Sequence, residues 1–535
     1  MNRAYDKNDG PLVTVLIPTY NRPHFLRVAM ESVVRQHYEN LEIFVMNDGG
    51  QDVSNVVESF GDKRIIFING KENRGLPCRL NEALAKAQGK YVCYLGDDDL
   101  FYRHHVGTLV DVLENKTDCH VAYSDLYKTY CRVNADGSRT VLSKIVEVSR
   151  DFDRFFMFYF NHALHVSLMH RRDLLDRAGP YNENLNVLID WDLTKRLVFY
   201  TDFHHIHDIT GEFCSPAGDC DRISVQRRKD KKDYTRNVMM IRTTRPPKPW
   251  PKVDDMSVIF TAEGFDQQAG NALGLIWRHT FYPYEVYLPM PQQQFASLNT
   301  EMPNLVNVPV PYGCSMERQV DACLAVCQGK YVTIVPRRFP ICEMWMEDPL
   351  YALLNNAADK PGLELELSSD KLWAAVIRRD VLVRARRQFG HLSVPQSLKR
   401  SGYHLERLEP DDISFQFDQL YNEAQDNEKN GNWSAAAQMY KYIADSHKNE
   451  VWMKGLAARS FYKAGEFERA LQYSRQVNQE RPTVDTLLTE GKICRARDDF
   501  GRAISLLEQA EEILEWGCGT PFCSTVQNGN PLRAQ

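Results

Sequence analysis

The chain has 535 residues, a formal net charge of −6, and 43% hydrophobic and 25% charged residues. A chain of this length exceeds a single hydrophobic core and predicts three or four domains, at about 150 residues each. Its charge gives no overall attraction to nucleic acid, which we exclude as a partner. We expect no transmembrane segment, because no apolar run approaches the ~20 residues of a membrane span.

The cysteines and the first ten residues indicate the cellular compartment of the protein. The 13 cysteines have no paired spacing, so we expect reduced, buried thiols. Cys323 and Cys327 lie four apart on a predicted helix; a packed helix face is favoured there over a metal pair. Residues 1–10 are polar and lack the apolar core of a signal peptide. We therefore expect a cytoplasmic protein, either free or peripheral to the inner face of the membrane.

Apolar strands alternate with helical patterns over the first hundred residues. The predicted strands cover residues 12–17, 41–46, 64–68 and 91–95, and the predicted helices cover residues 23–34, 53–60 and 76–87. This alternation predicts a parallel, doubly wound α/β sheet. Polar residues follow the first, second and fourth strands. Because ligands of such sheets bind outside the carboxyl ends of the strands, these polar residues mark the predicted site.

Three consecutive carboxylates, Asp97-Asp98-Asp99, follow the fourth strand directly. Carboxylates packed together repel one another and raise each other's pKa unless a cation is present. Mg²⁺ and Mn²⁺ typically bind one or two carboxylates together with substrate phosphates. The triplet therefore predicts a divalent cation, Mn²⁺ or Mg²⁺. For an isolated triplet the alternative is a solvated acidic turn.

Several short motifs occur in order over residues 13–100: Ile17-Pro18-Thr19-Tyr20-Asn21-Arg22, Asn47-Asp48-Gly49, Asn73-Arg74-Gly75, Leu80-Asn81-Glu82 and Gly96-Asp97-Asp98-Asp99. Together they resemble the inverting family-2 glycosyltransferases of the GT-A fold, and the match continues more loosely to about Ile223. The resemblance implies a metal-dependent enzyme that uses a nucleotide-sugar donor, with UDP preferred. Its acceptor would be a hydroxyl of a glycan, a lipid-linked glycan or another carbohydrate-bearing molecule.

The donor site is assigned by the resemblance, residue by residue. Thr19, Tyr20 and Asn21 match the loop around the base and ribose, and Asp48 is placed to accept a hydrogen bond from the base. Arg74 is a candidate for a phosphate contact, with a solvated turn arginine as its alternative.

Asn81 matches the family asparagine near the nucleotide, and its alternative is an exposed helix residue. Asp98 takes the metal-binding place and Asp99 follows it. The family's first aspartate falls on Gly96, which leaves Asp97 as the candidate for the ribose contact.

The catalytic base is expected at Asp190, in Val187-Leu188-Ile189-Asp190-Trp191-Asp192-Leu193, which resembles the family's Glu-Asp-Trp-Asp-Leu motif. A carboxylate within hydrogen-bond reach can take the proton of the acceptor hydroxyl. A plain helix N-cap is the alternative for Asp190, and Asp192 is interpreted as a structural cap of the helix that follows.

On the acceptor side, Asp125 looks like the family's aspartate, with a turn residue as the alternative. We interpret His204, His205 and His207 as surface residues or residues behind the site rather than metal ligands. The aromatic run 152–160 is expected to pack in the core.

The middle of the chain predicts a connector and a second, altered copy of the first domain. Residues 226–252 are basic and then proline-rich, which is typical of a linker; a contact with a diphosphate or lipid phosphate is the alternative. Gln328-Gly329-Lys330-Tyr331-Val332 repeats Gln88-Gly89-Lys90-Tyr91-Val92. The acids are missing, since Arg337-Arg338-Phe339 replaces the aspartate triplet and Pro291 replaces Asp48. We therefore expect a degenerate, non-catalytic GT-A-like domain at 253–410, serving packing, dimerisation or glycan binding.

The end of the chain has a helical period. Gly431, Gly465 and Asp498 begin similar segments, and the intervals of 465 − 431 = 34 and 498 − 465 = 33 resemble tetratricopeptide repeats. We expect helical repeats at 411–516, which bind a protein partner, associate with a second copy or pack on their own chain. Residues 517–535 are expected to be disordered.

The sequence thus predicts a catalytic glycosyltransferase domain at 1–225, a linker at 226–252, the altered copy and the repeats. A rival interpretation is a non-enzymatic adaptor that binds glycan or nucleotide and recruits partners through its repeats; the retained acids of the first domain disfavour it. A nucleotidyltransferase is a third interpretation, but residues 18–22 lack the glycines of a phosphate loop.

Overall fold

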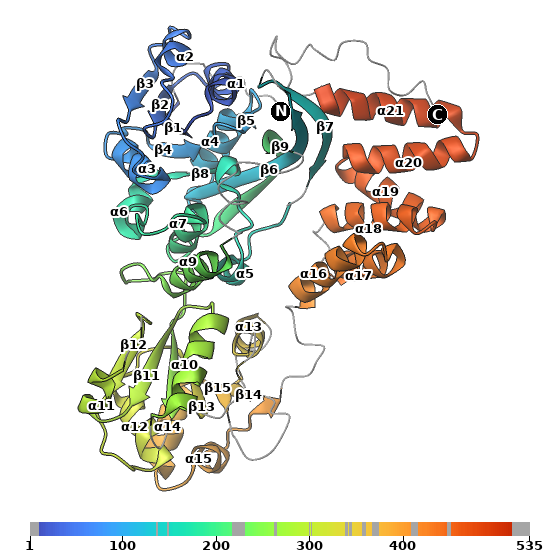
Figure 1. Cartoon of the computed structure of the whole chain (residues 1–535). Coiled ribbons are helices and arrows are strands. Elements are labelled where there is room, and N and C mark those ends of the chain that lie inside the picture. The colour runs from blue at the N-terminus through green and yellow to red at the C-terminus, as the bar shows by residue number, and fades with distance from the viewer. Residues whose placement is uncertain are drawn as a thin grey trace.

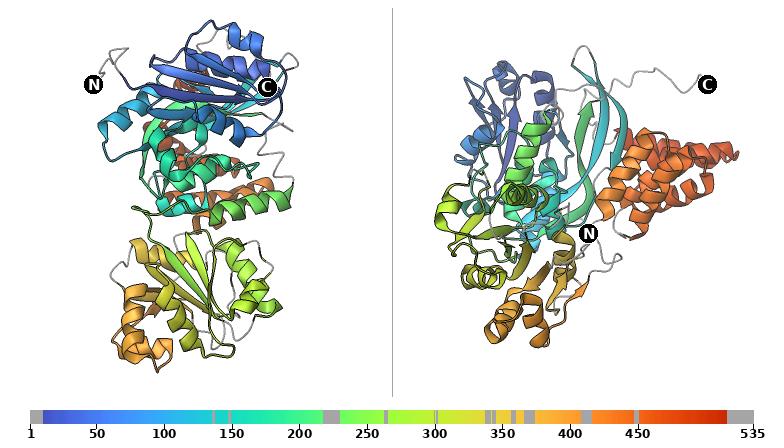
Figure 2. Two further views of the ribbon diagram at one scale, coloured as in Figure 1. Left: turned by 90° about the vertical axis from the view of Figure 1, so that its left-hand side faces the viewer. Right: turned by 60° about the horizontal axis from the view of Figure 1, so that its bottom comes forward.

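The structure is a computed structural model of the whole chain. It describes residues 10–134, 137–146, 149–216, 230–261, 265–298, 300, 302–336, 341, 345–355, 360–365, 374–407, 416–446 and 451–515. Figure 1 shows two α/β units and a helical array, and Figure 2 shows the two α/β units one above the other. No helix among the described residues has both the length and the apolar character needed to cross a membrane.

The first sheet confirms the predicted α/β class. Its strands follow the order β3-β2-β1-β4-β8-β6-β9-β5, with β7 paired to β6. The strands β1 to β4 are mutually parallel where they pair. Their bounds are β1 Val13–Thr19, β2 Leu41–Asn47, β3 Ile65–Asn69 and β4 Tyr91–Tyr94, and the helices between them are α1 Pro23–Val34, α2 Ser54–Glu58 and α3 Leu76–Leu84. The expected strands and helices therefore form within a few residues of their predicted ends.

The remainder of this unit completes the sheet beyond β4. The strand β8 runs antiparallel to both β4 and β6, and β6 is parallel to the long strand β9. The elements are β5 Leu100–Phe101, α4 His105–Asn115, β6 Val121–Val133, β7 Arg139–Val146, α5 Arg154–Tyr159, η1 His165–Ser167, β8 Leu168–Arg171, η2 Arg172–Leu174, α6 Leu175–Ala178, α7 Ile189–Leu197 and β9 Phe203–Pro216. The carboxyl ends of β1, β4 and β6 consequently point the same way.

The second sheet repeats the strand order of the first. Its order, β12-β11-β10-β13-β15-β14-β16, matches β3-β2-β1-β4-β8 over five strands, including the antiparallel fifth strand. The elements are β10 Met256–Thr261, α10 Gln267–His279, β11 Tyr284–Pro289, α11 Gln292–Ala296, β12 Leu305–Val308, α12 Met316–Val326, β13 Tyr331–Pro336, α13 Glu347–Asn355, β14 Gly362–Glu364, β15 Ala375–Arg378, α14 Arg379–Phe389, α15 Val394–Arg400 and β16 Glu406–Arg407.

The two copies also share a hydrogen bond at the repeated glycine. In the first copy the amide of Gly89 donates to Thr14 Oγ1 at 3.2 Å, and in the second the amide of Gly329 donates to Ser257 Oγ at 3.0 Å. A Cβ at Gly89 would lie 2.4 Å from Thr14 Oγ1, and one at Gly329 would lie 2.6 Å from Ser257 Oγ. Close approach of the neighbouring strand therefore requires glycine in both copies. The arginines expected in place of the aspartate triplet, Arg337 and Arg338, lie outside the described residues.

The linker contains an ordered helix that its composition did not indicate. Helix α9, Lys231–Thr243, occupies half of the expected connector, while residues 226–229 lie outside the described range. Lys195 of α7 is fully buried, and its Nζ donates to the carbonyl oxygens of Ile241 and Arg242, both at 2.5 Å. Burial lowers the pKa of Lys195 well below its usual value. The lysine thus ties the last turn of α9, where carbonyls lack helical partners, to the first unit.

Most of the aromatic run packs in the core, as expected, although Phe160 is 49% exposed. The run also joins the two α/β units. Phe155 in α5 contacts the rings of Phe281, Tyr282 and Tyr351 from the second unit, with centroids 5.1–5.7 Å apart. Residues from both units belong to one continuous apolar core. Cys323 and Cys327 are buried as free thiols in the second unit, on the packed face that was favoured.

The helical array packs against its own chain. Its helices are α16 Gln416–Lys429, α17 Trp433–Ser446, α18 Val451–Lys463, α19 Phe467–Glu480, α20 Val484–Ala496 and α21 Phe500–Glu515. The repeated positions Gly431, Gly465 and Asp498 have φ of 77°, 81° and 63°, so each begins a left-handed turn between helices. Helices α20 and α21 contact β7, and Figure 1 shows the array beside this strand. The expected disordered tail, residues 517–535, lies outside the described residues.

Candidate active site

The aspartate triplet lies at the carboxyl ends of β4 and β1. Thr19 Oγ1 donates to Asp97 Oδ2 at 2.8 Å. Arg22 follows β1, and its Nη1 lies 3.3 Å from Asp97 Oδ1 and 3.1 Å from Asp98 Oδ2. The guanidinium therefore bridges the two carboxylates. The loop after β1 and the triplet after β4 form one polar edge, as the sequence predicted for a parallel sheet.

The three aspartates have different environments. All three are buried. Burial, together with the charge of Asp98, raises the pKa of Asp97 to about 6, and Arg22 opposes this rise. Asp99 is tied to β9, because its Oδ1 accepts from the amide of Cys214 at 2.9 Å. Asp97 and Asp98 are thus the crowded pair, and Asp99 anchors the neighbouring strand.

Gly96, which stands where the family has an aspartate, is crowded by the triplet itself. A Cβ at Gly96 would lie 2.9 Å from Asp99 Oδ2 and 3.0 Å from Asp98 Oδ1. A side chain at this position would force those carboxylates to move. The departure from the family pattern therefore has a local steric reason.

Asp48 holds the loop that carries Arg74. Its Oδ1 accepts from the amide of Arg74 at 2.9 Å and from Arg79 Nε at 2.8 Å, and its Oδ2 accepts from the amide of Gly75 at 2.9 Å. Arg79 is buried and had not been singled out in the sequence. Its position three residues before Glu82, with which it forms an ion pair at 2.9 Å, was the available signal.

The other predicted donor residues differ in exposure. Tyr20 is 47% exposed at the edge. Asn21 has φ +58°, and its Oδ1 accepts from the amide of Gln51 at 2.7 Å, so it joins the loops after β1 and β2. The side chain of Arg74 is exposed and reaches Cys78 Sγ at 3.4 Å.

Asn81 is partly buried and clasps the segment that leads to α7. Its Nδ2 donates to the carbonyl oxygen of Tyr181 at 3.0 Å and to Glu183 Oε1 at 2.9 Å, and its Oδ1 accepts from the amide of Tyr181 at 2.8 Å. The alternative of an exposed helix residue is therefore wrong. These bonds fix the segment that precedes the predicted base.

Asp190 is the second residue of α7, so the N-cap alternative is wrong. The N-cap is Leu188, which has φ +60°. Asn161 Nδ2 donates to Asp190 Oδ2 at 3.0 Å. Burial raises the pKa of Asp190, and the hydrogen bond from Asn161 is one of the contacts that oppose this rise. The interpretation of Asp192 as a cap is also wrong, because Asp192 lies inside the helix and pairs with Arg196 at 2.8 Å.

A chain of ring contacts leads from the end of β4 to Tyr181. The ring of Tyr94, the last residue of β4, stacks on His165 with centroids 3.8 Å apart and meets Tyr181 edge-on at 6.2 Å. His165 Nε2 and Tyr181 Oη are hydrogen-bonded at 2.7 Å. The pKa of Tyr181 is raised by burial and, in smaller part, by the charge of Asp190. Asp190 is therefore near enough to Tyr181 to affect its pKa, and Tyr181 contacts the last residue of β4.

Asp125 belongs to a cluster that the sequence did not predict. It lies within β6, so the alternative of a turn residue is wrong. His205 Nε2 bonds Asp125 Oδ1 at 2.8 Å, and His205 Nδ1 bonds Asp151 at 2.9 Å. His207 Nε2 lies 3.0 Å from the same Asp151 oxygen. His205 is buried against Asp125, which excludes a surface position and agrees with the other predicted alternative, a residue behind the site. The i, i+2 spacing of the two histidines on one strand was the available signal for the cluster.

The helical array closes this cluster with an arginine. Arg481, between α19 and α20, bonds Asp125, Ser149 and His207. Asp125, His205 and His207 offer ligand atoms within 4.8 Å of one another and so could hold a metal ion. The guanidinium contacts two of these three residues, so it supplies the positive charge that a metal would otherwise bring.

A family model matches the part of the chain that holds the aspartate triplet. Residues 14–170 match the family model described as Glycosyl transferase family 2. This stretch, which holds the triplet and the loops around it, is a family 2 glycosyltransferase domain. An uncharacterised glycosyltransferase of Rickettsia typhi is 29% identical over 207 residues, covering 37% of this chain and 63% of the relative. The glycosyltransferase GlyA of Streptococcus pneumoniae is 36% identical over 113 residues, covering 20% of this chain and 16% of the relative.

The chain therefore spans less than two thirds of these curated relatives. Among solved structures, S. aureus TarS in complex with UDP-GlcNAc has a TM-score of 0.35 and 16% identity over 43% of this chain and 66% of that chain. The mannosyltransferase PcManGT of Pyrobaculum calidifontis, in complex with GDP-Man and Mn²⁺, has a TM-score of 0.34 and 18% identity over 45% of this chain and 67% of that chain.

Arg481 is predicted to hold the array against the first unit. Arg481→Ala leaves a buried carboxylate without its guanidinium partner, a change that costs about 3–5 kcal/mol when such pairs are broken. We expect earlier unfolding in denaturant and faster hydrogen exchange in β7 and α20. The control is Arg469→Ala, which removes a half-exposed pair with Glu466 inside the array and costs about 0–1 kcal/mol. Equal behaviour of the two variants would contradict the prediction.

Proposed function

We propose that this protein is a metal-dependent, inverting glycosyltransferase of hexosyltransferase type. It moves a sugar from a nucleoside diphosphate sugar, with UDP as the preferred nucleotide, to a hydroxyl of a glycan or lipid-linked glycan. The observation that carries the proposal is the pairing of Asp97 and Asp98 at the carboxyl ends of β1 and β4, inside the stretch that matches the family model. Asp190 supports it, because burial raises the pKa of its carboxylate.

The carboxylates at this edge suit a divalent cation. Asp97 and Asp98 are buried, and their crowding contributes to the raised pKa of Asp97. Arg22 places one positive charge between them in the protein alone, and a divalent cation would take its place there. Mg²⁺ or Mn²⁺ would be held by Asp98, with Asp99 beside it and substrate phosphates completing the shell. When bound, the ion neutralises the charge that develops on the leaving diphosphate.

The donor is proposed to lie across the loops after β1, β2 and β3. Tyr20 and Asn21 would flank the base and ribose, and Asp97 is the carboxylate nearest to Thr19 for the ribose contact. Asp48 contributes by holding the loop of Arg74, whose exposed guanidinium can meet a phosphate oxygen. The contacts of Asp48 with Arg74, Gly75 and Arg79 support a role in shaping this loop beside its proposed contact with the base.

Asp190 is proposed as the general base. Its carboxylate takes the proton of the acceptor hydroxyl as the acceptor oxygen bonds the anomeric carbon and the bond to the diphosphate breaks on the opposite face. Partial desolvation strengthens a carboxylate as a base, and the raised pKa of Asp190 agrees with this. Asp125 is proposed to contact the acceptor, in which case Arg481 and the array border the acceptor side.

Calorimetric titration of the full chain with UDP, GDP and dTDP, with and without Mn²⁺, tests the proposal. Metal-dependent binding of one nucleotide identifies the donor class. Absence of binding under every condition would contradict the enzyme and favour a glycan-binding adaptor that recruits partners through its helices.

Asp98→Ala is expected to abolish metal-dependent donor binding, because the ion loses its principal carboxylate. We expect nucleotide affinity in Mn²⁺ to fall at least about tenfold, to the value measured without metal. The measurement is the same titration, and Asp118→Ala, which removes an exposed carboxylate after α4, serves as the control. Unchanged affinity in Asp98→Ala would exclude it as the metal ligand.

Asp190→Asn is expected to lower turnover by roughly 10²–10⁴-fold, because the amide cannot accept the proton. Nucleotide binding should stay at the wild-type level, since Asp190 belongs to the acceptor side. Release of the nucleoside diphosphate with an acceptor glycan measures the rate, and Asp176→Asn, an exposed carboxylate on α6, is the control. Wild-type turnover in Asp190→Asn would disprove the assignment.

The pH dependence of turnover follows from the environment of Asp190. A base works only when ionised, so activity is present above its pKa and lost as the pH falls through it. Because burial raises this pKa, the acid limb of kcat/KM should lie at higher pH than the titration of an exposed aspartate. Asn161→Ala removes a hydrogen bond to the ionised form, so the limb should move to higher pH. The control Asn115→Ala, at an exposed position, should leave the acid limb in place. If the acid limb does not move in Asn161→Ala, it does not report the ionisation of Asp190.

A further inference from the structure

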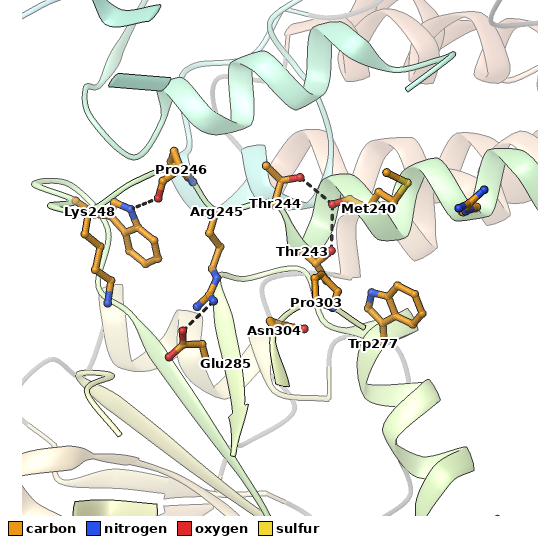
Figure 3. Close-up of a pocket in the computed structure, with 12 residues that line it drawn as sticks. Met240, Thr243, Thr244, Arg245, Pro246, Lys248, Trp277, Glu285, Pro303 and Asn304 are labelled. Atoms are coloured by element: carbon orange, nitrogen blue, oxygen red, sulfur yellow. Dashed lines mark hydrogen bonds and ion pairs between the residues drawn. The ribbon is translucent and has the colours of Figure 1, made fainter. Parts of the chain in front are cut away.

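A cavity of about 770 Å³ lies where the linker meets the second unit. Figure 3 shows its walls, which come from the last turn of α9, residues 244–250, α10, the beginning of β11 and residues 303–304. Its volume falls within the ~300–1,000 Å³ of small-molecule sites. None of its lining residues belongs to the candidate active site.

Two tryptophans supply flat apolar surface to this cavity. Trp250 is held in place because its Nε1 donates to the carbonyl oxygen of Pro246 at 2.9 Å. Trp277 projects from α10, and its Nε1 has no hydrogen-bond partner among the described residues. Both rings pack on the core and are partly buried. Indole rings combine an apolar face with a polar N–H, a combination that suits the C–H faces and hydroxyls of sugar rings.

Asn304 adds a second polar group without a partner. It is 3% exposed, and its Nδ2 donates to the carbonyl oxygen of Tyr284 at 2.9 Å, but within the described structure its Oδ1 has no donor. A buried acceptor without a donor is costly, so a ligand that satisfies it gains affinity. An unpaired acceptor and an unpaired N–H complement sugar hydroxyls, each of which donates and accepts.

The charges of the lining favour an acidic ligand. Three cationic side chains reach the cavity, namely Arg236, Arg245 and Lys248. Arg245 pairs with Glu285 at 2.9 Å, and Lys248 pairs with Asp255 at 2.5 Å. Within the described chain no ionic partner is recorded for Arg236, which is exposed on α9. A ligand with a carboxylate or phosphate group can therefore pair with Arg236 without displacing an acid of the protein.

The position of the cavity argues against a nucleotide. It opens at the amino end of β11, where Glu285 lies, whereas nucleotides bind open α/β sheets at the carboxyl ends of the strands. Helix α9 reaches the cavity with its C-terminal turn, at Thr243, and so it offers no N-terminal amides to a diphosphate.

We propose that this cavity binds an anionic saccharide, a sugar chain that carries carboxylate or phosphate groups. The site lies at the junction of the linker and the second unit and acts in binding alone. Saccharide binding would give the second unit a role that does not require the aspartates found only in the first unit. It goes beyond the proposed transfer reaction, and a glycan held there would remain attached to the protein between turnovers.

The test is calorimetric titration of the full-length Asp190→Asn protein, which binds without turnover. The probes are oligogalacturonate for carboxylates, mannopentaose phosphate for phosphates, maltohexaose as the neutral chain, and UDP. We expect one or both acidic probes to bind, which also distinguishes the two acid groups, and maltohexaose to bind at least about tenfold more weakly.

Two variants locate the binding. Trp277→Ala and Arg236→Ala should each weaken the acidic probe about tenfold or more. The controls are Leu275→Ala, an exposed residue of α10, and Lys231→Ala, which removes one charge from α9 outside the cavity. Because Arg236 is exposed, its variant tests the site even if Trp277→Ala unfolds.

Three results would overturn the inference. The first is no binding of any saccharide, and the second is equal binding of acidic and neutral chains. The third is UDP binding that is lost in Trp277→Ala but kept in Asp98→Ala, which would make the cavity a nucleotide site. None of them bears on transfer, which is measured separately with the wild-type protein.

Discussion

The crowding of buried carboxylates at the end of β4 is the constraint on which the rest of the site depends. Asp97 and Asp98 are held together because β4 is flanked on both sides and the triplet follows its end after only two residues. Neither can move away, since Thr19 holds one and Arg22 contacts both. Positive charge between the carboxylates, or a proton on one of them, relieves their repulsion. Arg22 supplies that charge in the protein alone, and a metal with its phosphates can take over the role.

The surrounding polar side chains hold loops in place through hydrogen bonds. Asp48 fixes the turn of Arg74, Asn21 joins two loops, and Asn81 clasps the segment before α7. Each of them ties together segments that are distant in sequence. A substrate edge built in this way keeps its shape without substrate, which lowers the entropy lost on binding. A residue at this edge can act by touching a ligand or by positioning a loop. The contacts of Asp48, Asn21 and Asn81 show that these three residues position loops.

The first unit was predictable from sequence to the extent that its signals are local. The strands β1 to β4 are apolar runs bounded by turn residues, so their parallel order and common polar edge follow directly. Helix α9 was missed because its polar composition resembles a linker, whereas its last turn is held by Lys195, which lies 46 residues before Ile241. The cluster of Asp125 was missed for the same reason. Its partner Arg481 lies 356 residues away in the sequence, so no local sequence pattern can indicate the contact.

The two copies show which features folding requires and which it does not. The glycine after the third helix is kept in both, because a neighbouring strand passes too close for a side chain. The acids at the sheet edge are not required by the sheet, since β10, β11, β12 and β13 pair as β1, β2, β3 and β4 do, while Pro291 stands where Asp48 would. The second unit lacks these acids but still packs on Phe155. It also has a cavity at the amino end of β11, whereas the acids of the first unit follow the carboxyl ends of its strands. Because the joint between the units is one apolar core, a ligand held in that cavity is carried rigidly with the active domain.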